Sequence, residues 1–87
     1  MARLKQLQDL DLSGTKITDA GLKELAGLKQ LEWLELDDTR ISDASLNVLA
    51  GFKKLELLDL EGTQVTREGV AKLQKVLPKC KIHHRAN

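Results

Sequence analysis

The stretch Leu31 to Leu36, LEWLEL, decides the fold because its apolar pattern recurs once upstream and once downstream at a fixed distance. Three columns of leucine are spaced by 24 residues: Leu7, Leu31 and Leu55; Leu10, Leu34 and Leu58; and Leu12, Leu36 and Leu60. A period of this length indicates an array of stacked units. We therefore predict one domain, 1–87, with a partial repeat at 1–6, repeats at 7–30, 31–54 and 55–78, and a terminal partial strand at 79–87.

Length and composition limit the size and chemistry of the core. A chain of 87 residues with 41% apolar side chains forms a small core, in which any loss of packing is felt. Trp33 and Phe52 are the only aromatic residues, so the core must be aliphatic. Fourteen basic and thirteen acidic residues give a formal net charge of +1. That balance does not by itself indicate nucleic acid or an anionic membrane as a partner.

The sequence gives few indications of cellular location. Cys80 is the single cysteine and cannot form an internal disulfide. The chain shows no apolar run long enough for a membrane span and no signal peptide, so the compartment stays open and the cytoplasm is weakly favoured. Leu4 holds the place that Leu28 and Phe52 hold at the end of a repeat. We therefore interpret Met1 to Arg3 as an added start and the chain as a piece of a longer protein.

Two periods alternate within each unit. The first six residues carry apolar side chains two positions apart, as Leu10 and Leu12 do, which is typical of a strand with one buried face. The later part spaces apolar residues by three, as one stripe of a helix does. These pairs are Leu22 and Leu25, Leu46 and Leu49, and Val70 and Leu73. Each unit is predicted to be a short strand followed by a short helix.

Residue types also predict where the helices begin and end. The N-cap residues, whose side-chain oxygens accept hydrogen bonds from amides of the first turn, are Thr18, Ser42 and Thr66. Asp19 and Asp43 follow two of these caps, where a negative charge meets the positive end of the helix dipole. Gly27 and Gly51 are predicted to end helices in the left-handed conformation, and Pro78 to end the last helix.

A strand and a helix that return to a parallel strand within 24 residues leave only a short crossover. Doubly wound α/β domains use longer crossovers of unequal length. Short and equal crossovers predict that each unit stacks on the last with a constant rotation, with strands on the inner side and helices on the outer side.

These residues carry a family resemblance. The pattern LxxLxLxxTxITDxGLxxLxxL is complete in Leu7 to Leu28 and returns in degraded form from Leu31 and Leu55, and it resembles a leucine-rich repeat. The ITDAGL at Ile17 to Leu22 is similar to a subgroup found in bacterial repeat proteins and in the cysteine-containing repeats of F-box proteins. The resemblance implies an α/β right-handed solenoid with a short parallel β-sheet on the concave side and short helices on the convex side.

The sequence departs from that family at the turn. Thr15, Thr39 and Thr63 stand where the family often has Asn or Cys, and a threonine hydroxyl can still bond to the backbone there. No F-box-like segment accompanies the repeats, so a ubiquitin-ligase role does not carry over. In the final partial repeat Lys79 falls where a leucine is due, and Cys80 is predicted to take the inward place.

The outward strand residues form three columns because side chains alternate along a strand. The columns are Asp9, Trp33, Leu57 and Lys81; Asp11, Glu35, Asp59 and His83; and Ser13, Asp37, Glu61 and Arg85. Residues 8–13, 32–38 and 56–61 together hold nine acids and no base, whereas the rest of the chain holds the lysines and arginines. A protein of nearly balanced charge is therefore predicted to be strongly polarised.

This face favours a protein-binding module that takes a basic peptide or protein segment, with Trp33 and Leu57 as an apolar centre in an acidic frame. The predicted partner-binding residues are Trp33, Leu57, Asp9, Asp11, Glu35, Asp37, Asp59 and Glu61. One alternative is a merely solvated sheet on which Trp33 folds down over its neighbours or contacts a second copy. Another is a structural segment that caps or spaces a longer array, with Pro78 to Asn87 as its terminal layer.

The sequence favours neither an enzyme nor a metal protein, and it predicts no cofactor. The row of Asp11, Glu35, Asp59 and His83 holds its groups parallel, whereas a metal needs ligands that converge on one point. His83 and His84 are predicted to point to opposite faces. Cys80 is interpreted as a small buried hydrophobe without a supporting base.

Two further surfaces are visible in the sequence. A basic rim, Lys16 and Arg40 with Lys53 and Lys54, lacks the interleaved aromatics of a nucleic-acid site and is interpreted as solvated. At the N-terminal end of the array, Leu4 to Leu12 would expose apolar side chains that an earlier repeat normally covers. We therefore expect a homo-oligomer, a dimer or larger, formed through exposed repeat ends.

Overall fold

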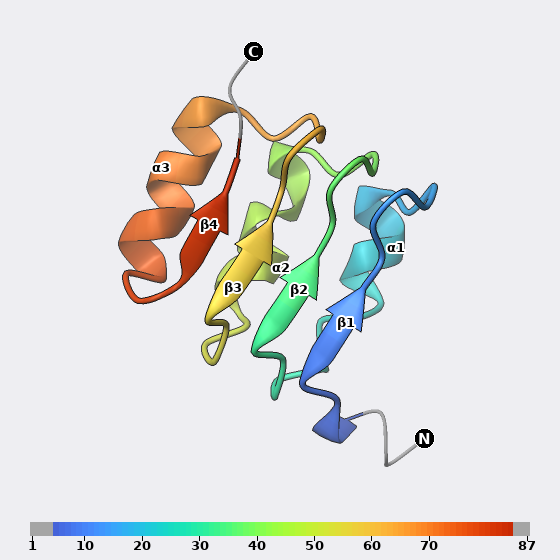
Figure 1. Ribbon diagram of the computed structural model, residues 1–87, viewed down its shortest axis with the longest axis vertical. Helices are drawn as coiled ribbons and strands as arrows, with labels where there is room; N and C mark the ends of the chain where they lie inside the picture. The colour runs from blue at the N-terminus through green and yellow to red at the C-terminus, as the bar shows by residue number, and fades with distance from the viewer. Residues whose placement is uncertain (1–4, 85–87) are drawn as a thin grey trace.

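The computed structural model describes residues 5–84, so Met1 to Leu4 and Arg85 to Asn87, with the expectations attached to them, lie outside the described chain. Four parallel strands form one sheet in the order β1-β2-β3-β4, and the helices lie behind the sheet in Figure 1. The strands are β1 (Asp9–Asp11), β2 (Trp33–Glu35), β3 (Leu57–Asp59) and β4 (Lys81–His83). The helices are α1 (Asp19–Lys23), the 3₁₀ helix η2 (Asp43–Ser45), α2 (Leu46–Ala50) and α3 (Arg67–Val76). The predicted α/β solenoid is confirmed.

The register of the sheet keeps the 24-residue step of the sequence. Leu10 lies beside Leu34, Leu34 beside Leu58, and Leu58 beside Ile82. Each strand therefore places the same repeat position next to its counterpart, which produces continuous columns of side chains on both faces of the sheet.

The core is made of aliphatic layers, as the composition predicted. Leu34, Leu36, Leu58 and Leu60 are fully buried, and Phe52 is the aromatic residue among the buried side chains. Cys80 is also buried, so the prediction that it takes the inward place of a leucine is confirmed. The first layer differs from the others, because Leu7, Leu10, Leu12 and Ile17 pack against the core but stay partly exposed.

Threonine hydroxyls stabilise the turn after each strand. The Oγ1 atoms of Thr15, Thr39 and Thr63 donate to the carbonyl oxygens three residues earlier at 2.7, 2.6 and 2.7 Å. The predicted threonine–backbone bond is confirmed in all three turns. The residue just before each threonine has a positive φ: Gly14 at 72°, Asp38 at 58° and Gly62 at 73°.

The predicted left-handed caps at Gly27 and Gly51 are wrong. The positive φ values belong to the strand turns, and Gly51 has φ −77°. The amides of Gly51 and Phe52 bond to carbonyls three residues earlier, those of Val48 and Leu49, so tight 3₁₀-type turns satisfy the end of α2 without a left-handed residue. The predicted N-caps are confirmed, with Thr18 and Thr66 accepting from Gly21 and Gly69, and Ser42 accepting from Ala44.

Candidate protein-binding face

The outward side chains of the strands form the columns that the sequence indicated. Asp9 lies beside Trp33, Trp33 beside Leu57, and Leu57 beside Lys81 in the sheet. The second column runs through Asp11, Glu35, Asp59 and His83 in the same register. The third column contains Ser13, Asp37 and Glu61. There the amide of Gly14 donates to the carbonyl of Asp37, and the amide of Asp38 donates to the carbonyl of Glu61, so the segments after the strands lie side by side. Arg85, the last member of that column, lies outside the described residues.

Trp33 is the large aromatic side chain that this face presents to solvent. It keeps 45% of its surface exposed, so the indole is not folded into the interior. Leu57, its neighbour in the register, is half-buried. Beside the indole lies an open hollow of about 390 Å³ lined by Asp9, Leu10, Asp11, Trp33 and Glu35. The structure therefore places an apolar surface and three carboxylates around one concavity.

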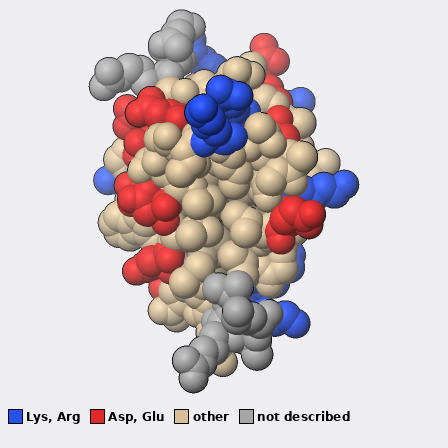
Figure 2. All heavy atoms as spheres, turned by 90° about the vertical axis from the view of Figure 1, so that its right-hand side faces the viewer, with Lys and Arg blue, Asp and Glu red and all other residues tan. Residues whose placement is uncertain are grey.

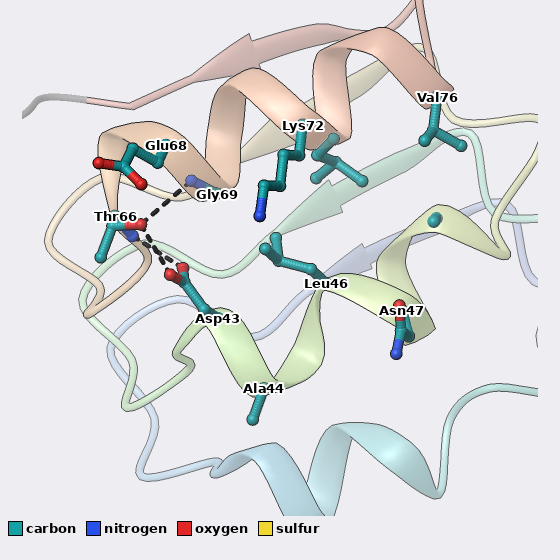
Figure 3. Close-up of a pocket in the computed structure, with 11 residues that line it drawn as sticks. Asp43, Ala44, Leu46, Asn47, Thr66, Glu68, Gly69, Lys72 and Val76 are labelled. Atoms are coloured by element: carbon teal, nitrogen blue, oxygen red, sulfur yellow. Dashed lines mark hydrogen bonds between the residues drawn. The ribbon is translucent and has the colours of Figure 1, made fainter.

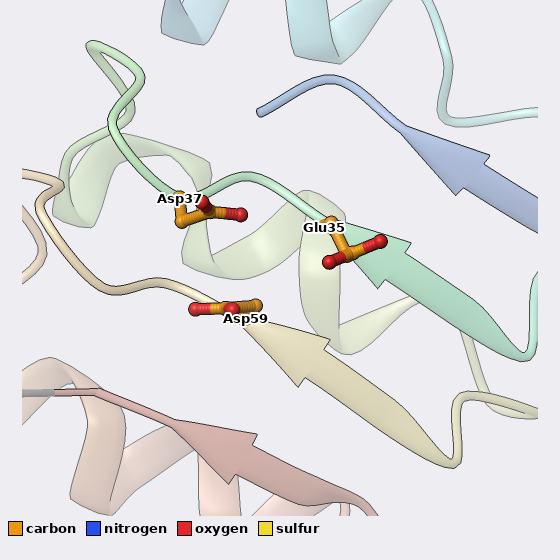
Figure 4. Close-up of side chains that lie close together, drawn as sticks. All are labelled: Glu35, Asp37 and Asp59. Carbon is orange, nitrogen blue, oxygen red and sulfur yellow. The ribbon is translucent and has the colours of Figure 1, made fainter. Parts of the chain in front are cut away.

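Three acids on this face converge more closely than the sequence predicted. One carboxylate oxygen from each of Glu35, Asp37 and Asp59 lies within 4.8 Å of the others, and Figure 4 shows the three side chains gathered between β2 and β3. Sequence reasoning placed Asp37 in a separate column and therefore missed this group. Oxygen donors of this kind suit a hard cation such as Ca²⁺, although exposed acidic groups also gather without one.

Asp37 is the member of the acidic group whose charged form is disfavoured. Its Oδ1 atom is buried and makes no hydrogen bond within the described chain. Burial raises the pKa of Asp37, and the neighbouring carboxylates of Asp59, Asp38 and Asp11 raise it further. A nearby cationic group would counteract these effects, because an opposite charge favours the ionised form.

Two other acids of the face are tied to their own turns. The hydroxyl and amide of Ser13 donate to Asp11, and these bonds lower the pKa of that carboxyl. The amide of Glu61 donates to Asp59 Oδ1 at 3.0 Å. Asp11 and Asp59 are therefore held in fixed orientations by the residue two positions on, so the acidic surface is partly preorganised.

Lysine and arginine avoid the sheet face of the first three strands. Figure 2 looks onto the β1 side of the molecule and shows acidic side chains gathered along the left margin, which is the sheet side of Figure 1. Basic side chains in that view are most prominent at the top and on the helical side, and blue atoms also appear at the left margin. The acids of the first three strands therefore lie on the sheet side, and other acids lie on the helical side.

Two aspartates of the convex side link neighbouring repeats, a role that the sequence analysis missed. Asp19 accepts from the amide and hydroxyl of Ser42 at 2.9 and 2.6 Å, and from the hydroxyl of Ser45. Asp43 accepts from the amide and hydroxyl of Thr66 at 2.9 and 2.6 Å. Both side chains reach the N-cap residue of the following repeat and tie two layers together. The recurring 23-residue spacing from each aspartate to that cap residue was the available signal.

A groove on the convex side lies between α2 and α3. Figure 3 shows it with Asp43 and Thr66 joined at one end and Lys72 and Val76 along α3. Its volume is about 420 Å³. Gly69 permits the close approach, because a Cβ at this position would lie 2.5 Å from the Asp43 carboxylate. Acidic and basic side chains both line the groove, so its charge does not favour one class of ligand.

Cys80 does not have the surroundings of a nucleophile. Burial raises the pKa of its thiol to about 11. Its Sγ atom contacts the backbone carbonyl of Lys81 at 3.8 Å. A thiol with a raised pKa is mostly protonated at neutral pH and is a poor nucleophile.

Comparison with known proteins identifies the family. The sequence pattern of the leucine rich repeat matches residues 5–65. The chain belongs to the leucine-rich repeat family. Among solved structures, a leucine-rich repeat protein of Leptospira interrogans is similar with 28% identity and a TM-score of 0.60, over 87% of this chain and 25% of that one. An internalin of Listeria monocytogenes is similar with 25% identity and a TM-score of 0.56, over 97% of this chain and 32% of that one.

These leucine-rich repeat neighbours are longer proteins, and the chain spans about a quarter to a third of their length. No curated protein matched the sequence closely enough to count as a relative. The family and its neighbours support a protein–protein interaction module in general. Within residues 5–84, none of the helices is both long and apolar enough to cross a membrane.

Proposed function

We propose that this leucine-rich repeat chain binds a basic peptide or protein segment on the acidic concave face of its sheet, with Trp33 at the centre. The observation that carries the proposal is the hollow at β1 and β2, where a half-exposed indole stands beside Asp9, Asp11 and Glu35. An aromatic face next to carboxylates suits the flexible apolar stem and charged end of an arginine or lysine side chain.

Charge complementarity favours a basic occupant over other partners. The carboxylates of Glu35, Asp37 and Asp59 lie close together on the same face, and burial already disfavours the charge on Asp37. An acidic segment would add like charge and be repelled, whereas a cationic segment would be attracted and steered toward the sheet. Leu57 and Trp33 would supply apolar contact beneath such a segment.

The proposal is tested with a synthetic peptide of alternating arginine and serine, titrated while Trp33 fluorescence and the heat of binding are followed. We expect saturable binding that weakens as salt rises, because exposed charges are screened. Replacing Glu35 and Asp59 with Gln and Asn should weaken binding at least about tenfold, which corresponds to roughly 1.4 kcal/mol. A serine-for-arginine peptide of equal length controls for backbone contacts.

Matched variants separate a binding role from a structural one. Trp33→Ala should weaken binding while leaving the melting temperature nearly unchanged, because the indole is half exposed. Glu24→Gln on the convex side removes an acid without touching the sheet and should bind like the parent chain. If Trp33→Ala lowers the melting temperature and peptide affinity is the same for all variants, the chain acts as a cap or spacer of a longer array and the binding proposal fails.

We also propose that the chain forms a homo-oligomer through its exposed repeat ends. Leu10, Leu12 and Ile17 remain partly exposed, whereas their counterparts one repeat later are fully buried. Covering these side chains with another apolar layer would be favourable by roughly 25 cal/mol for each Å² removed from water. Light scattering over a concentration series should show mass rising above the monomer, and a monomer at every concentration would contradict this.

A further inference from the structure

Two of the recurring backbone bonds between neighbouring repeats lie outside the strand ladder and have their acceptor in the earlier repeat. At the end of the turn, the carbonyl of Ile17 accepts from Arg40 N at 3.2 Å, and the carbonyl of Ile41 accepts from Gln64 N at 2.9 Å. At the start of the strand, the carbonyl of Gln8 accepts from Trp33 N, and that of Glu32 accepts from Leu57 N. At these two places each repeat offers a carbonyl group to amides of the repeat that follows.

The last repeat places side chains where those amides would come. Val65 occupies the position of Ile17 and Ile41, and its carbonyl lies 2.8 Å from His84 Nε2. A carbonyl oxygen can only accept, so Nε2 is the donor. Cys80 occupies the position of Gln8, and its carbonyl accepts from Gln74 Nε2 at 2.8 Å. Gln74 Nε2 also donates to the carbonyl of Leu77 at 2.9 Å.

The opposite end of the stack is less covered in the part of the chain that the structure describes. Within residues 5–84 no layer covers the first strand, and Leu7, Leu10, Leu12 and Ile17 keep part of their surface in contact with solvent, although Leu22 is buried. Figure 2, which faces this end, shows mostly uncharged atoms across the middle of the surface. In the last layer Leu77 and Cys80 are buried, and Ile82, the counterpart of Leu10, is partly buried.

We propose that Gln74 and His84 close the C-terminal side of the repeat stack, so that further layers, including those of a second copy, join only through the N-terminal side. The inference rests on the proposed self-association for its choice of partner. Two copies that meet through the same end form a closed dimer, whereas copies that meet end to opposite end continue into open chains. A stack with one closed end should therefore stop at a dimer.

The test compares Gln74→Glu, His84→Ala and the double variant with the parent chain. A carboxylate at position 74 cannot donate to the two carbonyls, and alanine at position 84 has no donor. Gln64→Glu and His83→Ala make the same chemical changes at neighbouring positions outside the closure. The thermal midpoint and the mass from light scattering are measured over a range of protein concentrations in 0.3 M NaCl (roughly a 6 Å screening length), which reduces repulsion between the acidic β1 edges.

We expect both closure variants to lower the thermal midpoint more than the controls, and the double variant to form species larger than a dimer while the parent chain stops at a dimer. Unchanged midpoints in the closure variants would overturn the closure, and so would a parent chain that itself grows beyond a dimer. A parent chain that remains a monomer would overturn the self-association proposal alone. The closure is then decided by the midpoints.

Discussion

Asp19 is the side chain whose removal tests the stacking of the repeats most sharply. Its carboxylate lies on α1 and accepts three hydrogen bonds from the next repeat, two from Ser42 and one from the hydroxyl of Ser45. Ser45 is 1% exposed, so its hydroxyl is sheltered from water in the folded protein. Asp19→Ala should therefore break the link between two layers and also leave a buried donor without a partner.

The size of the effect follows from these contacts. Hydrogen bonds to a charged group contribute roughly 1.5–3 kcal/mol, and an unsatisfied buried hydroxyl costs about 1–3 kcal/mol. These contributions share one carboxylate and are not additive. Water also screens the exposed part of the Asp19 side chain. We expect a loss of about 2–4 kcal/mol in the free energy of unfolding, which corresponds to a fall of roughly 10–25 °C in melting temperature for a domain of this size.

The assay is thermal and urea unfolding followed by circular dichroism, with Asp9→Ala as the control for removal of an exposed acid. Adding Ser45→Ala to Asp19→Ala removes the orphaned hydroxyl and should recover about 1 kcal/mol, because deleting both partners is milder than deleting one. An Asp19→Ala variant as stable as Asp9→Ala, or a double variant less stable than Asp19→Ala, would refute the reasoning.

The pH dependence of Asp19 has a definite sign. Burial alone would raise the pKa of Asp19, but the bonds from Ser42 and Ser45 together outweigh burial and lower it below the usual 3.8. A carboxyl with a lowered folded pKa stabilises the protein above its unfolded pKa, and this stability is lost as the pH falls through the folded value. The difference between parent and Asp19→Ala should therefore be full at pH 6 and shrink below pH 3.8.

Three further predictions address other parts of the molecule. Asp37→Asn should stabilise the protein at pH 7, because burial and nearby acids raise the pKa of Asp37. This gain should vanish below the usual pKa of 3.8, where the parent side chain is also protonated. Equal stability of parent and variant at pH 7 would contradict this. Leu34→Ala should cost about 2–5 kcal/mol in urea unfolding and Leu10→Ala clearly less, because Leu34 is fully buried and Leu10 partly exposed; similar losses would argue against an open first layer. Cys80, with its pKa raised to about 11, should react with iodoacetamide at pH 8 only as fast as the protein unfolds. Mass spectrometry follows the labelling. Rapid labelling of the folded chain would contradict this, because it would show that the thiol is accessible.

The sequence was sufficient for the parts of the fold that depend on local repetition. The spacing of Leu10, Leu34 and Leu58 predicts the register because a parallel sheet of equal units must place equal positions side by side. The alternation of side chains along a strand likewise predicts that Trp33 and Asp11 face outward. These inferences required no knowledge of how the layers meet.

Features that depend on the meeting of layers were missed or predicted wrongly. Asp19 and Asp43 were assigned to their own helix dipoles, whereas their bonds reach the next repeat. The left-handed residues were placed at the helix ends, although the tight turn after each strand is where the chain needs a positive φ. Asp37 joins Glu35 and Asp59 because the chain turns after β2, and a strictly alternating strand does not anticipate that convergence.

A nuclear magnetic resonance titration with the arginine–serine peptide tests the proposed binding face most directly. We predict that the largest amide shifts fall on residues 9–11, 33–37 and 57–61, together with the indole N–H of Trp33, and that an otherwise equal glutamate–serine peptide causes none of them. Shifts that concentrate on α2 and α3, or that are the same for both peptides, would contradict the account.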